Sequence, residues 1–253
     1  LLFAVFPSVY ATLFSRHYLL MFAILGALIL RGLAPEMYEQ RHDERWQRRW
    51  GQAFVAGSLA APFALGVFAG NWVFGVRGVA SAASLTIGLA LVALTVVDGA
   101  AFLGLKTRGN LRHETRVFGH IAQGVYLVLA VGGLVLGSSA AHVSLTAPAT
   151  LALLGVTVAL AVVHVVAGRR GRHYVAFAAA AAQVYGLVAL IAVLLYPSVD
   201  PVTGLTAEGA IVSTLPLNLT TIGATVLLPL VATYFVVLYS AFDGPVDEAD
   251  GYA

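Results

Sequence analysis

The chain of 253 residues contains no cysteine and few charged residues. Without cysteine it cannot form disulfides, thiolate metal sites or a cysteine nucleophile. Aspartate, glutamate, lysine and arginine make up only 10% of the residues, which is too little polar surface to cover a soluble globule. The net charge of +2 is spread over short clusters between apolar runs rather than gathered on one face. We therefore expect no nucleic-acid partner.

Short motifs of common catalytic sites are also missing from the sequence. It has no Gly-rich phosphate loop, no G-x-S-x-G motif and no H-E-x-x-H motif. The residues therefore predict neither hydrolytic catalysis nor a metal site in this chain.

Apolar residues dominate what is present, at 60% of the chain with a mean hydropathy of +0.89. A helix needs about 20 such residues to cross a bilayer, and several runs reach that length. We predict an all-α polytopic integral membrane helical bundle, with about seven full transmembrane helices and a partial one at residues 1–14. One transmembrane domain is expected to cover residues 1–253. The predicted spans are 18–34, 52–74, 83–105, 117–137, 148–167, 173–196 and 217–242.

Connections rich in lysine and arginine alternate strictly with connections that hold few of them. Loops 35–51, 106–116 and 168–173 hold eleven of them, whereas the intervening connections hold only Arg16 and Arg77. Because basic loops stay on the cytoplasmic side, we expect the charged loops and the C-terminus to be cytoplasmic in a cell membrane. The longest connection on the other side, 197–216, combines turn residues with a mildly apolar stretch that suits the membrane surface.

An aromatic pattern follows Pro35 in the first charged loop. The proline is expected to kink or end the preceding helix near Ala34. Tyr38, His42, Trp46 and Trp50 then recur every four residues, which predicts one aromatic stripe on a helix lying at the interface. We interpret this segment as an anchoring connector, with partner docking or gating as the alternative.

Four ionisable residues are predicted within the spans or at their cytoplasmic ends: Arg31, Asp98, His120 and His164. A charge at the centre of a spanning helix costs roughly 2.5–3.5 kcal/mol, so each such residue calls for a partner. Asp98 lies eight residues before Lys106, about 12 Å in from the charged end of its helix at 1.5 Å per residue. All four residues fall in the same half of the bundle, where they would form a polar or proton network.

Structural interpretations of the same residues stay open. Asp98 would pair with Arg31, or remain a neutral acid hydrogen-bonded between helices. His120 and His164 would be packing or interfacial histidines, or the two axial ligands of a haem. The remaining histidines lie at helix ends or in loops, where solvated imidazoles need no special role: His17, His42, His113, His142 and His173.

Several stretches together resemble subunit II of the cytochrome bd-type quinol oxidases. The most specific is the Gly-Ala-x-x-Leu-x-x-Lys-Thr-x-Gly-x-Leu element that ends one span and begins the next. The matching stretches are "VFPSVYATLFSRHYLLMFAILGALILRGLAPEMYEQR", "WQRRWGQAFVAGSLAAPFALGVFAGNWVFGV", "GAAFLGLKTRGNLRHETR", "YPSVDP" and "LNLTTIGATVLLPLVATYFVVLYSAFDG".

This resemblance implies a heterodimeric respiratory oxidase that oxidises quinol and reduces dioxygen to water. In that family the haems and the quinol-binding loop belong to subunit I. This chain would then ligate no haem, would stabilise a haem-bearing partner in the lipid, and would contribute to a proton or dioxygen path or bind a structural quinone. Arg31 matches the family's arginine at the end of its helix. A further N-terminal helix and a His-Trp-Asp segment are expected to precede the sequence given.

Two other classes of protein remain as alternatives. One is a cofactor-free secondary transporter that uses Asp98 and Arg31 as coupling residues, although the inverted repeats common in such proteins are not visible. The other is a self-sufficient b-type membrane cytochrome with His120 and His164 as haem ligands.

Overall fold

The computed structural model describes residues 2–139 and 143–241. The predictions for His142 and for the cytoplasmic C-terminal tail fall outside these residues. Within them every regular element is a helix except for one small hairpin, which confirms the all-α fold class. Its helices are α1 (Leu2–Val5), α2 (Pro7–Arg16), α3 (Tyr18–Glu39), α4 (Glu44–Phe74), α5 (Ala82–Lys106), α6 (Gly109–Gly137), α7 (Pro148–Arg169), α8 (His173–Leu195), α9 (Ala207–Ala210) and α10 (Thr214–Ala241).

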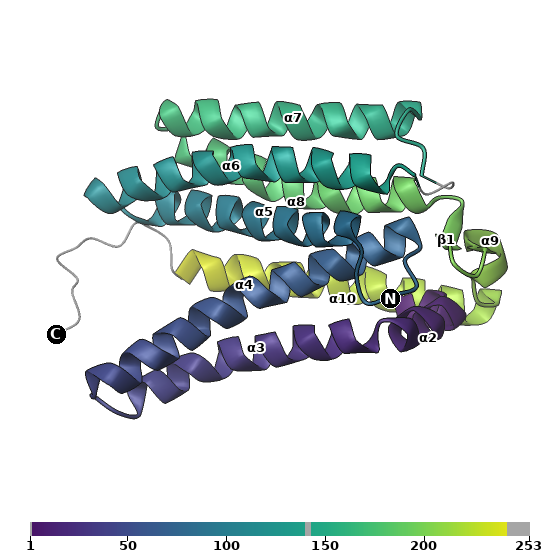
Figure 1. The fold of residues 1–253 in the computed structure, drawn as a ribbon, viewed down its shortest axis with the longest axis horizontal. Helices are drawn as coiled ribbons and strands as arrows, with labels where there is room; N and C mark the ends of the chain where they lie inside the picture. The colour runs from purple at the N-terminus through teal and green to yellow at the C-terminus, as the bar shows by residue number, and fades with distance from the viewer. Residues whose placement is uncertain (1, 140–142, 242–253) are drawn as a thin grey trace.

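Seven of the described helices, α3 to α8 and α10, are long and apolar enough to cross a membrane. They run along the long axis of the molecule (Figure 1). The strands β1 (Ser198–Asp200) and β2 (Leu205–Thr206) form an antiparallel pair. Together with α9 they lie beside α2 at the end opposite the charged turns (Figure 1). The molecule therefore has a charged-loop end and a hairpin end.

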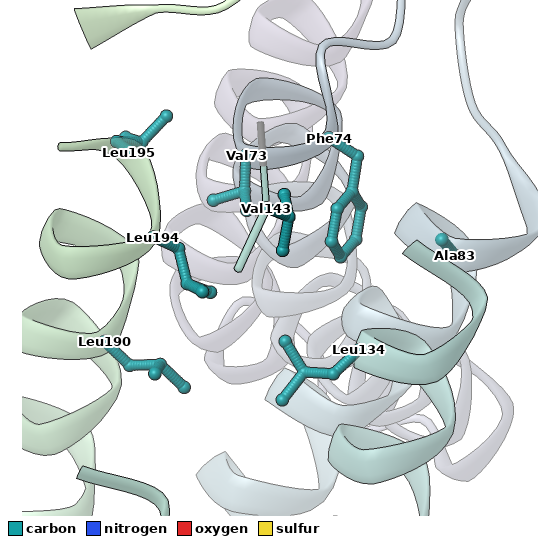
Figure 2. Packing of buried hydrophobic residues seen from close by; sticks show 8 residues of the cluster. All are labelled: Val73, Phe74, Ala83, Leu134, Val143, Leu190, Leu194 and Leu195. Atoms are coloured by element: carbon teal, nitrogen blue, oxygen red, sulfur yellow. The ribbon is translucent and has the colours of Figure 1, made fainter. Parts of the chain in front are cut away.

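Neighbouring spans pack in chain order, since α3 lies on α4, α4 on α5, α5 on α6 and α7 on α8. One apolar cluster joins α4, α5, α6 and α8 near the hairpin end, as Figure 2 shows for Phe74, Leu134 and Leu194. Elsewhere small residues permit close approach: a Cβ built on Gly66 would lie 2.7 Å from the Cα of Gly88. Backbone contact of this kind is how helices associate where lipid gives no hydrophobic drive.

The aromatic connector is not a separate interfacial helix, so that prediction was wrong. Tyr38 belongs to α3, which continues past Pro35 to Glu39. A proline removes one helical hydrogen bond, and membrane helices tolerate this when neighbouring groups compensate. Trp46 and Trp50 belong to α4, whose N-terminus is capped by Asp43 through the backbone N–H of Trp46 at 3.2 Å.

The two halves of the predicted stripe still meet across the α3–α4 turn. The Trp46 indole donates to the carbonyl of Met37 at the end of α3. The Arg41 guanidinium lies 4.8 Å from the centre of the Trp46 ring, in cation–π contact. The segment is thus a tight helical hairpin. The charged loop 106–116 is likewise mostly helical, because α6 begins at Gly109.

Candidate functional site

Three of the four predicted site residues come together toward the charged-loop end of the bundle. Asp98 lies on α5, His120 on α6 and His164 on α7. His164 is only 3% exposed, and its Nδ1 lies 3.0 Å from the Ala176 carbonyl oxygen of α8. This contact fixes the orientation of the imidazole and points its Nε2 toward α6. We refer to Asp98, His120 and His164 as the Asp–His cluster.

Two glycines make room for the imidazoles. A Cβ on Gly168 would lie 2.9 Å from Nε2 of His120, so a larger residue at this position would force the His120 ring to shift. A Cβ on Gly119 would lie 3.0 Å from that of Ala100, so α5 and α6 also approach closely here. The rings of His120 and His164 meet edge to face, with centroids 5.8 Å apart and an interplanar angle of 89°.

Polar atoms of the cluster are buried without protein partners. Within the described residues, neither Asp98 Oδ1 nor His164 Nε2 has a hydrogen-bond partner. Such an atom costs about 1–3 kcal/mol when left unsatisfied. Asp98 also lies within electrostatic range of His164. The carboxyl and the imidazole are therefore close enough to interact, although no hydrogen bond joins Asp98 Oδ1 to His164 Nε2.

A small cavity lies beside the two histidines, and its lining includes His164 but not Asp98. It offers about 20 Å³ to the centre of a water molecule and is lined by His120, His164 and Arg116 among others. One water needs roughly 10–15 Å³ of such room and two to four polar partners. The geometry therefore suits a single bridging water.

Arg31, the fourth predicted residue, lies apart from the cluster. It is exposed on α3, and its backbone packs on α4, where a Cβ built on Gly57 would lie 2.9 Å from the Arg31 nitrogen. Among the described residues, Arg16 and Asp200 form a salt bridge, whereas Arg31 and Asp98 do not. The Arg31–Asp98 pair considered from the sequence does not form.

The two histidines of the cluster do not fit a haem in this arrangement. Their rings touch each other, and the space beside them holds about one water rather than a porphyrin. Over residues 2–139 and 143–241, no group of three or more histidine, cysteine, aspartate or glutamate side chains is placed to hold a metal ion.

The hairpin end carries a second polar site. Arg16 at the end of α2 donates two hydrogen bonds to Asp200 of β1, from Nη1 to Oδ1 at 2.9 Å and from Nη2 to Oδ2 at 3.0 Å. Thr203 donates its hydroxyl to Oδ2 at 2.7 Å, and the Val202 amide donates to Oδ1 at 3.2 Å. Burial alone would raise the pKa of the Asp200 carboxyl, but these hydrogen bonds hold its pKa below the ordinary value.

Two contacts with α4 complete this second site. The Trp72 indole donates to the Val199 carbonyl at 2.7 Å and so ties β1 to α4. His17 is only 3% exposed, with its ring edge to face against Phe68. Burial, and secondarily the charge of Arg16, lowers the pKa of His17. The expectation that His17 is a solvated helix-end histidine was wrong, because its ring is buried against Phe68 of α4.

Comparison with known proteins settles the family. Residues 1–242 match the family model described as cytochrome bd terminal oxidase subunit II. The chain belongs to that family. With seven apolar helices among its described residues, this subunit II chain is a multi-pass membrane protein.

Curated relatives carry the same description. The chain is 23% identical to cytochrome bd-I ubiquinol oxidase subunit 2 of Escherichia coli strain K12, over 98% of this chain and 79% of that protein. It is 30% identical to cytochrome bd ubiquinol oxidase subunit 2 of Bacillus subtilis, over 50% of this chain and 41% of that protein. A probable cytochrome oxidase subunit 2 of Haemophilus influenzae is 28% identical over 51% of this chain.

Sequence reasoning missed the hairpin-end site of this subunit II chain. Arg16 was noted only as one of two basic residues on its side of the membrane, and Asp200 only as part of the "YPSVDP" turn. Their separation of 184 residues leaves no local pattern that would pair them. The composition around Arg16 could have indicated that it has a partner, because Arg16 lies among apolar residues that lead directly into a span.

Proposed function

We propose that this chain acts as subunit II of a cytochrome bd-type quinol oxidase. It works beside a haem-bearing subunit I in a complex that oxidises quinol and reduces dioxygen to water. The observation that carries the proposal is the family match over residues 1–242, supported by relatives that are themselves named ubiquinol oxidase subunits. The complex is an oxidoreductase of the respiratory chain, and this chain is its non-catalytic subunit.

Stabilisation of the partner is the first role that we assign to the chain. In the most apolar part of α10 no residue is buried within the chain, and in the most apolar part of α3 only 11% of the residues are buried. These helices are therefore free to face lipid or another subunit. The haems lie in subunit I, in keeping with an arrangement of His120 and His164 that leaves no room for a porphyrin.

Proton handling is the second role, and it rests on the Asp–His cluster. A part-buried carboxyl and two imidazoles on successive spans are the groups from which membrane proton relays are built. The unpartnered atoms of Asp98 and His164 and the water-sized cavity support this role. Arg31 stands apart from the cluster as a separate polar position of α3. Passage of dioxygen and binding of a structural quinone are further proposals to which we assign no residues.

The charged-loop end is proposed to face the cytoplasm. Eleven lysine and arginine residues in the loops of that end, against two on the other side, support this orientation. The Asp–His cluster would then lie in the cytoplasmic half of one transmembrane domain and exchange protons with that side.

Co-purification tests the proposal. The chain, tagged at its C-terminus, is expressed in its native membrane, solubilised and purified, and the proteins that accompany it are identified by mass spectrometry. We expect a haem-bearing polytopic partner in a ratio of about one to one, with its visible haem spectrum. Purification without any haem protein would contradict the assignment. A haem spectrum from this chain expressed alone, and lost in His120→Ala, would instead favour the b-type cytochrome.

A further inference from the structure

A second cavity lies at the charged-loop end, where the α5–α6 and α7–α8 connections meet. Its volume is about 530 Å³, and its lining includes three arginines and no described acidic residue. The lining residues that matter here are Arg108, Arg112, Arg172, Leu105, Tyr174 and Val175. We call this the arginine cavity. It adjoins the water-sized cavity beside His120 and His164, because His173 lines both cavities.

Arg112 supplies the donor that an anion would satisfy in the arginine cavity. The Nε of Arg112 is buried and has no hydrogen-bond partner among the described residues. A guanidinium presents a rigid fork of donors that matches phosphate oxygens, and an unsatisfied buried donor favours an anionic ligand.

Two helices begin at the arginine cavity and add to its potential. Helix α6 starts at Gly109 and α8 at His173, and neither N-cap residue, Arg108 or Arg172, makes a side-chain capping hydrogen bond. The first N–H groups of a helix lack intrahelical acceptors and carry partial positive charge. Arginine forks and helix N-termini are both groups that bind phosphate oxygens in proteins.

Apolar residues at the mouth of the arginine cavity indicate the source of the phosphate. Tyr174 is 70% exposed and Val175 45%, and both lie on the first turn of the α8 span. This is the level at which lipid headgroups meet the acyl chains, and basic pockets between spans at that level suit anionic headgroups. We propose that the arginine cavity binds the phosphate of an anionic phospholipid, whose acyl chains leave over Tyr174 and Val175. The proposal needs only the membrane placement of the chain, not the oxidase assignment.

Native mass spectrometry of the purified protein, with the subunits that accompany it, provides the test. The protein is delipidated in detergent and titrated with phosphatidylglycerol, phosphatidylcholine or inorganic phosphate. We expect phosphatidylglycerol to bind at a site that phosphatidylcholine does not fill. In Arg112→Gln/Arg172→Gln its affinity should fall about 30-fold, since each basic residue near the surface favours anionic lipid by about fivefold. The matched control is Arg48→Gln/Arg49→Gln, which removes two exposed arginines from the other charged connector and should bind like the wild type.

Each other outcome overturns the proposal. Equal binding of phosphatidylcholine by the wild-type protein would show that no anionic site exists, and this result does not depend on the variants folding. Displacement of bound lipid by millimolar inorganic phosphate would assign the cavity to a free anion. The segment 243–253 holds four acidic residues, Asp243, Asp247, Glu248 and Asp250. Lipid binding that occurs only after its deletion would assign the cavity to the chain's own tail.

Discussion

Arg16 and Asp200 form a bidentate salt bridge that joins the start of the chain to the connection between its last two spans, 184 residues away. Asp200 is fully buried, whereas the Arg16 side chain keeps 16% exposure. The bridge fastens β1 to α2, and Trp72 fastens the same strand to α4. The hairpin end is thereby locked against the N-terminal part of the bundle.

Removal of the Asp200 charge should destabilise the subunit. In Asp200→Asn, Arg16 loses its anionic partner, and breaking a buried pair costs about 3 kcal/mol when one partner is part-exposed. The apparent Tm of the purified protein in detergent should therefore fall by roughly 6–12 °C. Glu208→Gln, an exposed acid on α9 of the same connection, serves as the control and should leave the Tm unchanged. An Asp200→Asn protein as stable as the wild type would mean that the bridge contributes nothing.

Protonation of the Asp200 carboxylate should lower the stability of the subunit at acidic pH. The hydrogen bonds of Arg16 and Thr203 hold the pKa of Asp200 below its ordinary value, which is about 3.9 in an unfolded chain. Its contribution is therefore complete above about pH 4 and is lost as the pH falls through the folded pKa. The Tm difference between wild type and Asp200→Asn should stay constant from about pH 7 to 5 and shrink below about pH 4. A difference that already closes near pH 6 would assign the effect to another group, such as His17.

A buried amide pair links α6 to α8 and should behave as one unit. Gln123 and Gln183 exchange two hydrogen bonds, at 2.9 and 3.1 Å, and both side chains are buried. Gln183→Leu would leave the Gln123 amide unsatisfied and should cost roughly 1–2 kcal/mol, or about 2–8 °C in Tm. The double variant Gln123→Leu/Gln183→Leu should recover most of that loss, because no orphaned amide remains. Additive losses in this double-mutant cycle would show that the two side chains act independently.

The Asp–His cluster should affect turnover more than assembly. Asp98→Asn keeps the size of the side chain but removes its acid–base function, which typically contributes about 100-fold to a proton-transfer step. We expect quinol-dependent oxygen uptake per haem to fall at least tenfold, with an altered pH profile and a near-normal yield of complex. Glu114→Gln, on the exposed face of α6, is the control. Unchanged uptake and pH profile in Asp98→Asn would reduce the cluster to structural packing.

Most of the fold was predictable because membrane spans are set by local hydrophobicity. Each predicted span corresponds to a helix, from α3 to α8 and α10. The helix ends were less predictable, since Pro35 lies inside α3 and α6 extends through a basic loop to Gly109. These differences arise where charged residues continue a helix beyond the apolar layer, which hydropathy alone cannot detect.

The candidate site was predictable only in part. Distance from the charged helix end places Asp98, His120 and His164 at similar depth, and the structure brings them together. Depth does not say which face of a helix a residue occupies, so Arg31 was grouped with them although it lies on α3, beyond α4. The contact of Arg16 with Asp200 depends on how the hairpin folds back over α2, which no local pattern encodes.

Oxygen consumption by the affinity-purified complex tests the central claim most directly. Wild-type complex isolated through this chain is placed in an oxygen electrode cell with a reduced short-chain quinol. The account predicts rapid oxygen uptake that depends on the quinol, scales with the haem content of the preparation and disappears when the complex is absent. A pure, folded preparation that contains this chain and consumes no oxygen with any quinol would contradict it.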